Sequence, residues 1–136
     1  MADYLLDTNH ASPLVTLGHP LRQRILQSLR DGHHFSVSVP AVAETLFGLG
    51  LLPRAKQNLA EWARLRATIP CYVPDEIDAE AAAHLQISLR RRGIRLETVD
   101  ALIAAVSLRY DLTLLTTDKD FRSVPGLEQE NWLTTP

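Results

Sequence analysis

The chain has 136 residues, the length of one ordinary domain, and 46% of them are hydrophobic, which is enough to build one core. Its net charge of -2 provides no global attraction to nucleic acid, so a polyanion would have to be held by local basic patches or bridging cations. The single cysteine, Cys71, excludes an internal disulfide framework and a cysteine-based metal cage. It suits a reducing cytosol, and no segment approaches the roughly 20 apolar residues of a membrane span. We therefore expect one globular cytoplasmic domain over residues 1–136, without a membrane segment.

In chain order, the first predicted element is a short buried strand at residues 4–6, which stops at Asp7. Pro13 and Pro20 each predict a helix start, since proline tolerates the first helical turn. Apolar residues at helical spacing then predict a helix over residues 21–29. A strand is expected at 35–39 and a helix from Pro40 to about residue 52.

The second half of the chain repeats this alternation of strands and helices. We expect a helix over 55–69, a strand at 71–73, and a helix over about 75–92 that Gly93 ends. Thr98 is predicted to cap a helix over 99–110, and strands are expected at 112–115 and, on the edge of the sheet, at 131–133. Such alternation predicts an α/β fold in which helices cover both faces of a parallel sheet.

Four acidic residues are candidates for one site: Asp7, Glu44, Asp100 and Asp118. Asp7 and Asp118 follow apolar strands, and parallel sheets place their binding crevice at the strands' carboxyl ends. Each also has a simpler interpretation, because Asp favours helix caps, first helical turns and the turns after strands. Glu44 is harder to explain in that way, since it carries the only charge in an apolar helix and should face a cleft, a cation or a hydrogen-bonding partner. The coincidence of the set favours a shared site.

Clustered carboxylates repel one another unless a cation lies among them. All-oxygen ligands favour Mg²⁺, or Mn²⁺, over zinc, and one or two such ions would suit metal-assisted hydrolysis of a phosphodiester.

Four stretches together resemble the motifs of PIN-domain ribonucleases, and more narrowly the VapC-type toxins of bacterial toxin–antitoxin pairs. They are residues 5–9 (LLDTN), 43–44 (AE), 100–105 (DALIAA) and 115–121 (LTTDKDF). The resemblance covers essentially the whole chain. It implies a three-layer α/β/α sandwich with a central parallel sheet, and catalytic, metal-binding acids at Asp7, Glu44, Asp100 and Asp118.

The same resemblance implies supporting roles for Thr8, Asn9, Thr116 and Asp120, and it leaves open whether Asp120 touches the metal directly. The sequence departs from the pattern at His10, where relatives usually carry an aliphatic residue. We interpret His10 as a partly exposed helix histidine, with an RNA contact as the alternative.

Two surface features suggest partners. Arg90, Arg91, Arg92 and Arg95 form the densest basic cluster, which suits either an RNA backbone or a solvated helix end. Residues 46–52 (LFGLGLL) carry more apolar surface than one helix readily buries, which suits either a partner surface or core packing. The resemblance implies a small cognate antitoxin and a homodimer.

The sequence thus predicts a Mg²⁺-dependent endoribonuclease that acts as the toxin of a type II toxin–antitoxin pair on tRNA or rRNA. A catalytically silent PIN-like module that binds RNA or protein is the main alternative. A phosphatase with Asp7 as nucleophile is disfavoured because Asn9 stands where a second acid would be needed. A phosphoacceptor receiver domain is disfavoured because Lys119 is misplaced.

Overall fold

The computed structural model of the protein describes residues 1–133. Its elements are β1 (Asp3–Leu6), α1 (Thr8–Ala11), the 3₁₀ helix η1 (Ser12–Val15), α2 (Pro20–Arg30), β2 (His34–Ser38), α3 (Val39–Gly50), α4 (Ala55–Arg66), β3 (Cys71–Tyr72), α5 (Glu76–Arg91), α6 (Thr98–Arg109), β4 (Thr113–Leu115), the 3₁₀ helix η2 (Lys119–Ser123) and β5 (Gln129–Glu130). The strands form one sheet in the order β3-β2-β1-β4-β5, and every neighbouring pair is parallel. Within residues 1–133, no helix has both the length and the apolar character needed to cross a membrane.

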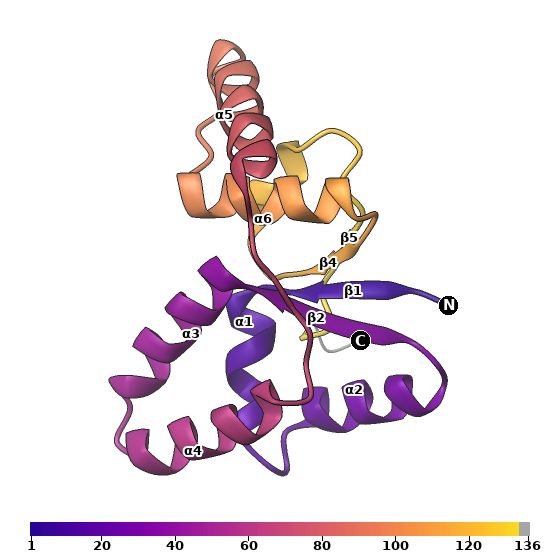
Figure 1. Cartoon of the computed structure of the whole chain (residues 1–136), viewed down its shortest axis with the longest axis vertical. Coiled ribbons are helices and arrows are strands. Elements are labelled where there is room, and N and C mark those ends of the chain that lie inside the picture. Colours follow the sequence, from indigo (N-terminus) through magenta and orange to yellow (C-terminus); the bar gives the residue numbers. More distant parts are fainter. Residues whose placement is uncertain (134–136) are drawn as a thin grey trace.

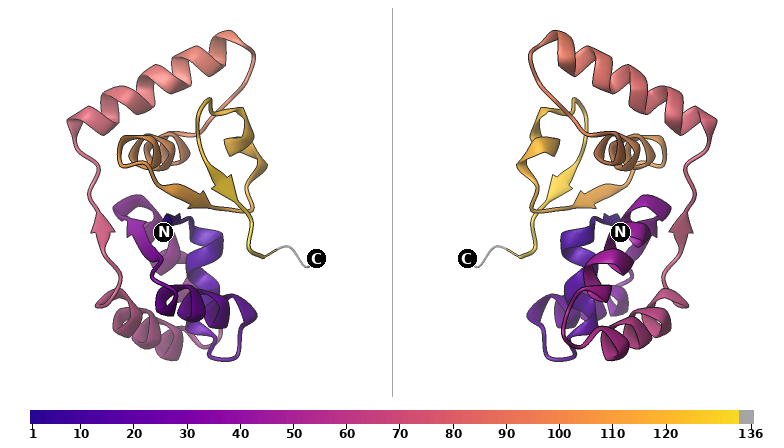
Figure 2. Two further views of the ribbon diagram at one scale, coloured as in Figure 1. Left: turned by 90° about the vertical axis from the view of Figure 1, so that its right-hand side faces the viewer. Right: turned by 90° about the vertical axis from the view of Figure 1, so that its left-hand side faces the viewer.

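Helices cover both faces of this sheet, as predicted. In Figure 1, α5 and α6 lie on one side of the sheet and α1 to α4 on the other, and the views of Figure 2 show the same separation. Successive residues of β1 point to opposite faces, so Leu5 packs in the core beneath α6 while Leu6 packs in the core that contains Trp62 of α4. A strand buried on both faces is continuously apolar, which explains the short apolar run at residues 4–6. The protein is a three-layer α/β/α sandwich.

The carboxyl edge of the sheet brings distant parts of the chain together. β1 and β4 are neighbours in a register that pairs Leu6 with Leu115. The backbone N–H of Asp7 continues the pairing by donating to the carbonyl of Leu115 at 3.0 Å. Asp7 and Thr116 therefore leave the sheet side by side, as the sequence predicted for the ends of these two strands.

Two predicted boundaries were wrong. The edge strand is Gln129–Glu130 rather than 131–133, because this strand pairs with β4 through only two residues and carries no apolar pattern of its own. Glu97, not Thr98, holds the N-cap position of α6, and the Thr98 hydroxyl instead accepts a hydrogen bond from Gln86. The predicted helix start at Pro13 is confirmed, although the element is the single 3₁₀ turn η1, which follows α1 directly.

Candidate metal centre

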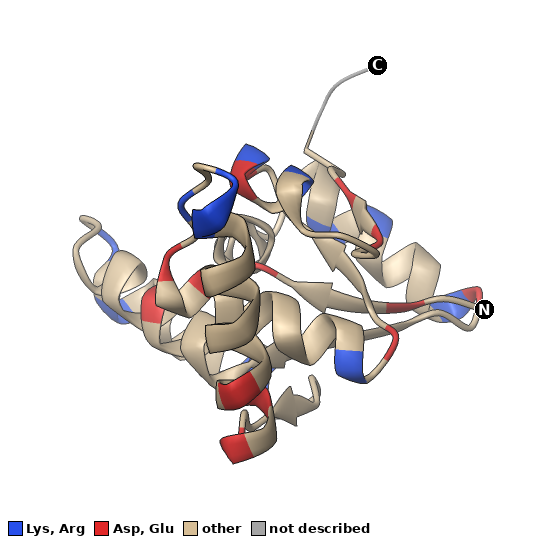
Figure 3. Cartoon of the chain, turned by 90° about the horizontal axis from the view of Figure 1, so that it is seen from above, with Lys and Arg blue, Asp and Glu red and all other residues tan. Residues whose placement is uncertain are grey.

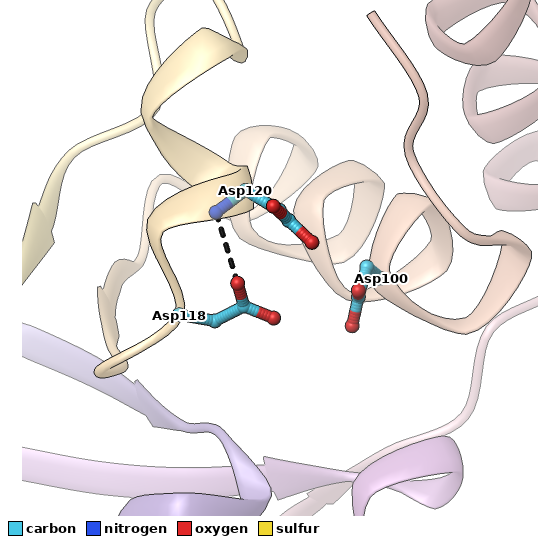
Figure 4. A group of neighbouring side chains, drawn as sticks. All are labelled: Asp100, Asp118 and Asp120. Carbon is cyan, nitrogen blue, oxygen red and sulfur yellow. Dashed lines mark hydrogen bonds between the residues drawn. The ribbon is translucent and has the colours of Figure 1, made fainter.

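Three carboxylates converge above the carboxyl edge of the sheet. Asp100 lies in the first turn of α6, while Asp118 and Asp120 lie at the start of η2. One carboxylate oxygen from each falls within 4.8 Å of the others, and Figure 4 shows the three side chains pointing toward one another. The Asp118 carboxylate also accepts the backbone N–H of Asp120 at 2.9 Å, which fixes the turn that presents both acids.

Asp7 lies next to this group and is held by several donors. It is the N-cap of α1, where one carboxylate oxygen accepts the N–H of Thr8 at 2.9 Å. Its other oxygen accepts the Thr116 hydroxyl at 2.7 Å and the Asn9 amide at 3.2 Å. The simpler interpretation of Asp7 as a helix cap is thus correct, and the side chain is also near enough to Asp118 for that charge to raise the pKa of Asp7. Asp7 is only 4% exposed.

Glu44 reaches the same edge from α3. Its carboxylate accepts the hydroxyl of Thr8 at 3.3 Å, and its charge raises the pKa of Asp100. The side chain is exposed, because α3 buries only Ala41, Thr45 and Leu49. The expectation of a hydrogen-bonding partner for this charge is confirmed, and solvent access explains how the charge is tolerated in an apolar helix.

The acids raise one another's proton affinity. Burial, followed by the charges of Asp118, Asp7, Glu44 and Asp120, raises the pKa of Asp100 to about 7. Burial also raises the pKa of Asp7, although the hydrogen bond from Thr116 opposes that shift. Repulsion of this kind is relieved by a bound cation.

The donor set fits a hard divalent cation. Carboxylate oxygens are the ligands that Mg²⁺ and Mn²⁺ prefer, and the group offers three of them within one ion's reach. Asp120 belongs to that converging group, whereas the oxygens of Asp7 and Glu44 lie outside it. The acidic group can therefore hold a metal ion.

The sequence-based interpretation of His10 was wrong. The side chain is 0% exposed, because the C-terminal segment packs against it. Its Nδ1 lies 2.6 Å from Oδ1 of Asn9, and its Nε2 accepts the backbone N–H of Trp132 at 3.0 Å. Burial, with a smaller effect of Arg24, lowers the pKa of His10 to about 4. A histidine 0% exposed cannot contact RNA, so the alternative is excluded as well.

One polar residue at this edge was missed by the sequence analysis. Ser38 ends β2, two residues beyond the position at which Ser36 pairs with Leu5 of β1, so it lies level with Asp7. Its hydroxyl is buried and has no hydrogen-bond partner among residues 1–133. The signal was present in the sequence, since serines alternate with apolar residues along this strand.

Three residues of the arginine cluster line a groove. Arg90, Arg91 and Arg95 surround a groove between the end of α5 and the start of α6, with Ile87 and Ile94 also in its wall. Arg92 is exposed but does not line the groove. The groove extends to Thr98, two residues before Asp100. Figure 3 shows Lys and Arg on several separate segments of the chain.

Solved structures share this architecture. The chain resembles the crystal structure of VapBC2 from Rickettsia felis bound to a promoter DNA fragment, with a TM-score of 0.83 and 22% identity over 96% of this chain and 98% of that one. It resembles DNA-bound VapBC from Salmonella typhimurium with a TM-score of 0.81 and 22% identity over 97% and 99% of the two chains. It also resembles VapC20 from Mycobacterium tuberculosis, described as a Sarcin-Ricin loop cleaving toxin, with a TM-score of 0.65 and 19% identity over 92% and 97%. At these identities the likeness shows the fold.

Comparison of sequences identifies the family. None of the curated proteins compared with the chain matches it. The family model described as PIN domain matches residues 4–127, which include all the candidate acids. The chain therefore belongs to the PIN domain family.

Proposed function

We propose that this PIN domain is a Mg²⁺-dependent endoribonuclease that acts as the toxin of a type II toxin–antitoxin pair. The observation that carries the proposal is the convergence of Asp100, Asp118 and Asp120 within 4.8 Å, with Asp7 beside them. The likeness to VapBC complexes and to a toxin that cleaves the Sarcin-Ricin loop supports the biological role. A cytoplasmic location agrees with the lone cysteine and remains part of the proposal.

The acidic residues would hold one or two ions of Mg²⁺ or Mn²⁺. A bound divalent ion supplies Lewis acidity toward water and the scissile phosphate. Asp100, Asp118 and Asp120 provide the converging oxygens, with Asp7 and Glu44 as further ligands, direct or through water. Because the pKa of Asp100 is about 7, a cation would displace its proton near neutral pH and complete the ligand set.

Neighbouring polar groups would keep these acids in place. The Thr116 hydroxyl donates to Asp7 at 2.7 Å and accepts the backbone N–H of Asp118 at 3.0 Å, so one side chain ties two candidate ligands together. The Thr8 hydroxyl donates to Glu44 at 3.3 Å. Asn9 donates to Asp7 and accepts from the backbone of Thr117 at 3.1 Å. These contacts support the expected supporting roles.

The RNA backbone would enter along the groove lined by Arg90, Arg91 and Arg95. Guanidinium groups bind phosphates in bidentate fashion, and a basic path is needed because the reaction centre itself is negative. The groove reaches Thr98 at the start of α6, two residues before Asp100, which supports this route. We propose structured RNA, tRNA or rRNA, as the substrate class.

A small antitoxin would bind the apolar surface of α3 and the α3–α4 turn. Phe47 is 72% exposed and Leu51 is 71% exposed. An adjacent groove between η1 and the α3–α4 turn is lined by Val15, Leu17 and Leu52. Exposed apolar residues gathered on one helix and the turn after it are typical of a protein interface. This supports an antitoxin partner, and a homodimer formed through the same region or elsewhere is part of the proposal.

The test is cleavage of labelled total tRNA and ribosomal RNA by antitoxin-free protein, with Mg²⁺ and with EDTA. Asp7→Asn removes one charge from the site, and Asp3→Asn makes the same change at the exposed opposite end of β1. We expect discrete fragments from wild type and Asp3→Asn in Mg²⁺, and none from Asp7→Asn or in EDTA.

The other outcomes separate the alternatives. Fragments that persist in Asp7→Asn would reveal a contaminating nuclease or remove Asp7 from the site. RNA binding with no cleavage of either RNA by any form would favour a catalytically silent binding module.

A further inference from the structure

A buried histidine connects the candidate metal centre to the C-terminal segment. His10 lies between Asn9, which contacts Asp7, and Trp132, which follows the last strand. Trp132 is itself fixed, because its ring lies 4.9 Å from Tyr4 and the Arg24 guanidinium stacks on it at 3.9 Å. The backbone N–H that faces His10 is therefore held in a defined position.

That N–H determines which nitrogen of His10 carries the proton. Nε2 accepts from Trp132, so it cannot be protonated, and a neutral imidazole must then carry its single proton on Nδ1. Nδ1 lies 2.6 Å from the Asn9 side chain. His10 is thus a donor toward Asn9, and the group it faces must be the oxygen of the Asn9 amide.

The orientation of the Asn9 amide in turn determines what faces Asp7. Oδ1 accepts from His10 and from the backbone N–H of Thr117, which leaves Nδ2 directed at Asp7 at 3.2 Å and at Thr116 at 3.4 Å. The opposite orientation would place an amide oxygen against the Asp7 carboxylate, which is repulsive. A correctly oriented Asn9 therefore supplies one of the three donors that hold Asp7.

We propose that His10 is a positioning residue that orients the Asn9 amide through its Nδ1–H and so holds the Asp7 carboxylate for cation binding. The relay runs from the backbone of Trp132 through His10 and Asn9 to Asp7. Its last step, cation binding, rests on the proposed function, whereas the orientation of Asn9 does not. A purely packing role for His10 would need neither ring nitrogen.

Two substitutions separate the two nitrogens. His10→Asn places an amide N–H near the position of Nδ1 and loses the acceptor for Trp132. His10→Gln places a carbonyl near the position of Nε2 and loses the donor to Asn9. Each variant keeps one of the two hydrogen bonds of the ring, so both should lower thermal stability to a similar extent.

The first measurement is proton exchange of the Asn9 side-chain amide by NMR in metal-free protein. We expect slow exchange in wild type and His10→Asn, and exchange at least about tenfold faster in His10→Gln, because the Asn9 oxygen then accepts only from Thr117 and the amide is held less firmly. Equal exchange in the two variants at equal thermal stability would overturn the proposal.

The second measurement is the affinity for Mn²⁺ by calorimetry, with Asp7→Asn as the control for complete loss of the Asp7 charge. We expect His10→Asn to bind as wild type and His10→Gln to bind about tenfold more weakly, the low end of the effect of removing a residue that orients a ligand. Equal affinity of both variants would refute the link from Asn9 to the cation. If wild type itself binds no Mn²⁺, the proposed function fails, and the exchange measurement still decides the role of His10 toward Asn9.

Discussion

Burial moves the pKa values of Asp100 and His10 in opposite directions, because in both side chains it penalises the charged form. The pKa of the Asp100 carboxyl is raised to about 7, with further contributions from the charges of the surrounding acids. The pKa of the His10 imidazole is lowered to about 4. Asp100 thus holds a proton more tightly in the folded state than in the unfolded state, and His10 holds one less tightly. Both residues make the stability of the metal-free protein depend on pH.

The raised pKa of Asp100 determines how the stability of the metal-free protein changes with pH. Below about pH 4 the carboxyl is protonated in both states, and as the pH rises through 7 the folded state must carry an unfavourable charge. We expect Asp100→Asn to raise the free energy of unfolding of metal-free protein by about 1–2 kcal/mol at pH 8, allowing for partial solvent screening, and to change it little at pH 4. Thermal denaturation at both pH values measures this, with Asp3→Asn as control. A variant less stable than wild type at pH 8 would contradict the electrostatic account.

At the scale of elements, α5 and α6 are joined through one buried carboxylate. Asp78 of α5 is 1% exposed and completes the capping box at the start of its helix by accepting the N–H of Asp75 at 2.9 Å. Arg109 at the end of α6 donates to Asp78 at 3.1 Å and to Asp75 at 2.8 Å. The second oxygen of Asp78 has no hydrogen-bond partner among residues 1–133. Arg109 is therefore the cation that compensates the buried carboxylate of Asp78.

We expect Arg109→Met to lower the free energy of unfolding by about 2–3 kcal/mol, since it leaves a buried carboxylate without its cation. Arg64→Met is the matched control, because the pair of Arg64 with Glu61 is made by a side chain that is 64% exposed and should contribute little to stability. Urea denaturation of both variants measures the difference. Similar losses of stability in the two variants would show that the buried pair stabilises the fold no more than the exposed pair does.

At the scale of the whole molecule, charge and apolar surface are separated in space. The acids gather at the carboxyl edge of the sheet, and three arginines line the groove between α5 and α6. The apolar surface, which includes Phe47 and Leu51, lies on α3 and the turn that follows it. Because the net charge is only -2, binding of a polyanion depends on where the arginines lie rather than on the overall charge.

We expect the double variant Arg90→Gln and Arg95→Gln to weaken RNA binding and to flatten its salt dependence by about 0.7–0.9 per arginine in a plot of log affinity against log salt. Arg30→Gln, at the end of α2 on the other side of the sheet, is the control. Filter binding over a range of KCl concentrations, with Ca²⁺ in place of Mg²⁺, measures the slopes. An unchanged slope would place the RNA elsewhere.

We expect Phe47→Ser to weaken antitoxin binding at least about tenfold without loss of thermal stability, because an exposed aromatic anchor contributes to an interface and little to the core. Ile77→Ser on α5 is the control, since Ile77 is 60% exposed on the other side of the sheet. Calorimetric titration with the antitoxin measures both affinities. Equal weakening by the two substitutions would indicate a general effect of lost apolar surface.

The sequence was sufficient to predict the elements that are buried on both faces. The apolar runs of β1 and β4 are recognisable because a strand covered by helices on each side must be apolar throughout. Their parallel order places Asp7 and Asp118 at one edge, and the pattern of acids predicted that edge as the site. The exposure of Phe47 and Leu51 was left open by the sequence, because an apolar helix packs equally well against a core or a partner.

The sequence by itself therefore determined the α/β class, the parallel sheet and the acids at its carboxyl edge, because periodicity and chain order are local properties of the chain. Only the tertiary structure decided the start of β5, the burial of His10, the isolation of the Ser38 hydroxyl and the dependence of Asp78 on Arg109. Each of these is set by contacts between residues far apart in the chain, as when Trp132 meets His10 across 122 positions. Local patterns carry no information on such contacts, since they depend on how the helices and the C-terminal segment pack on the sheet.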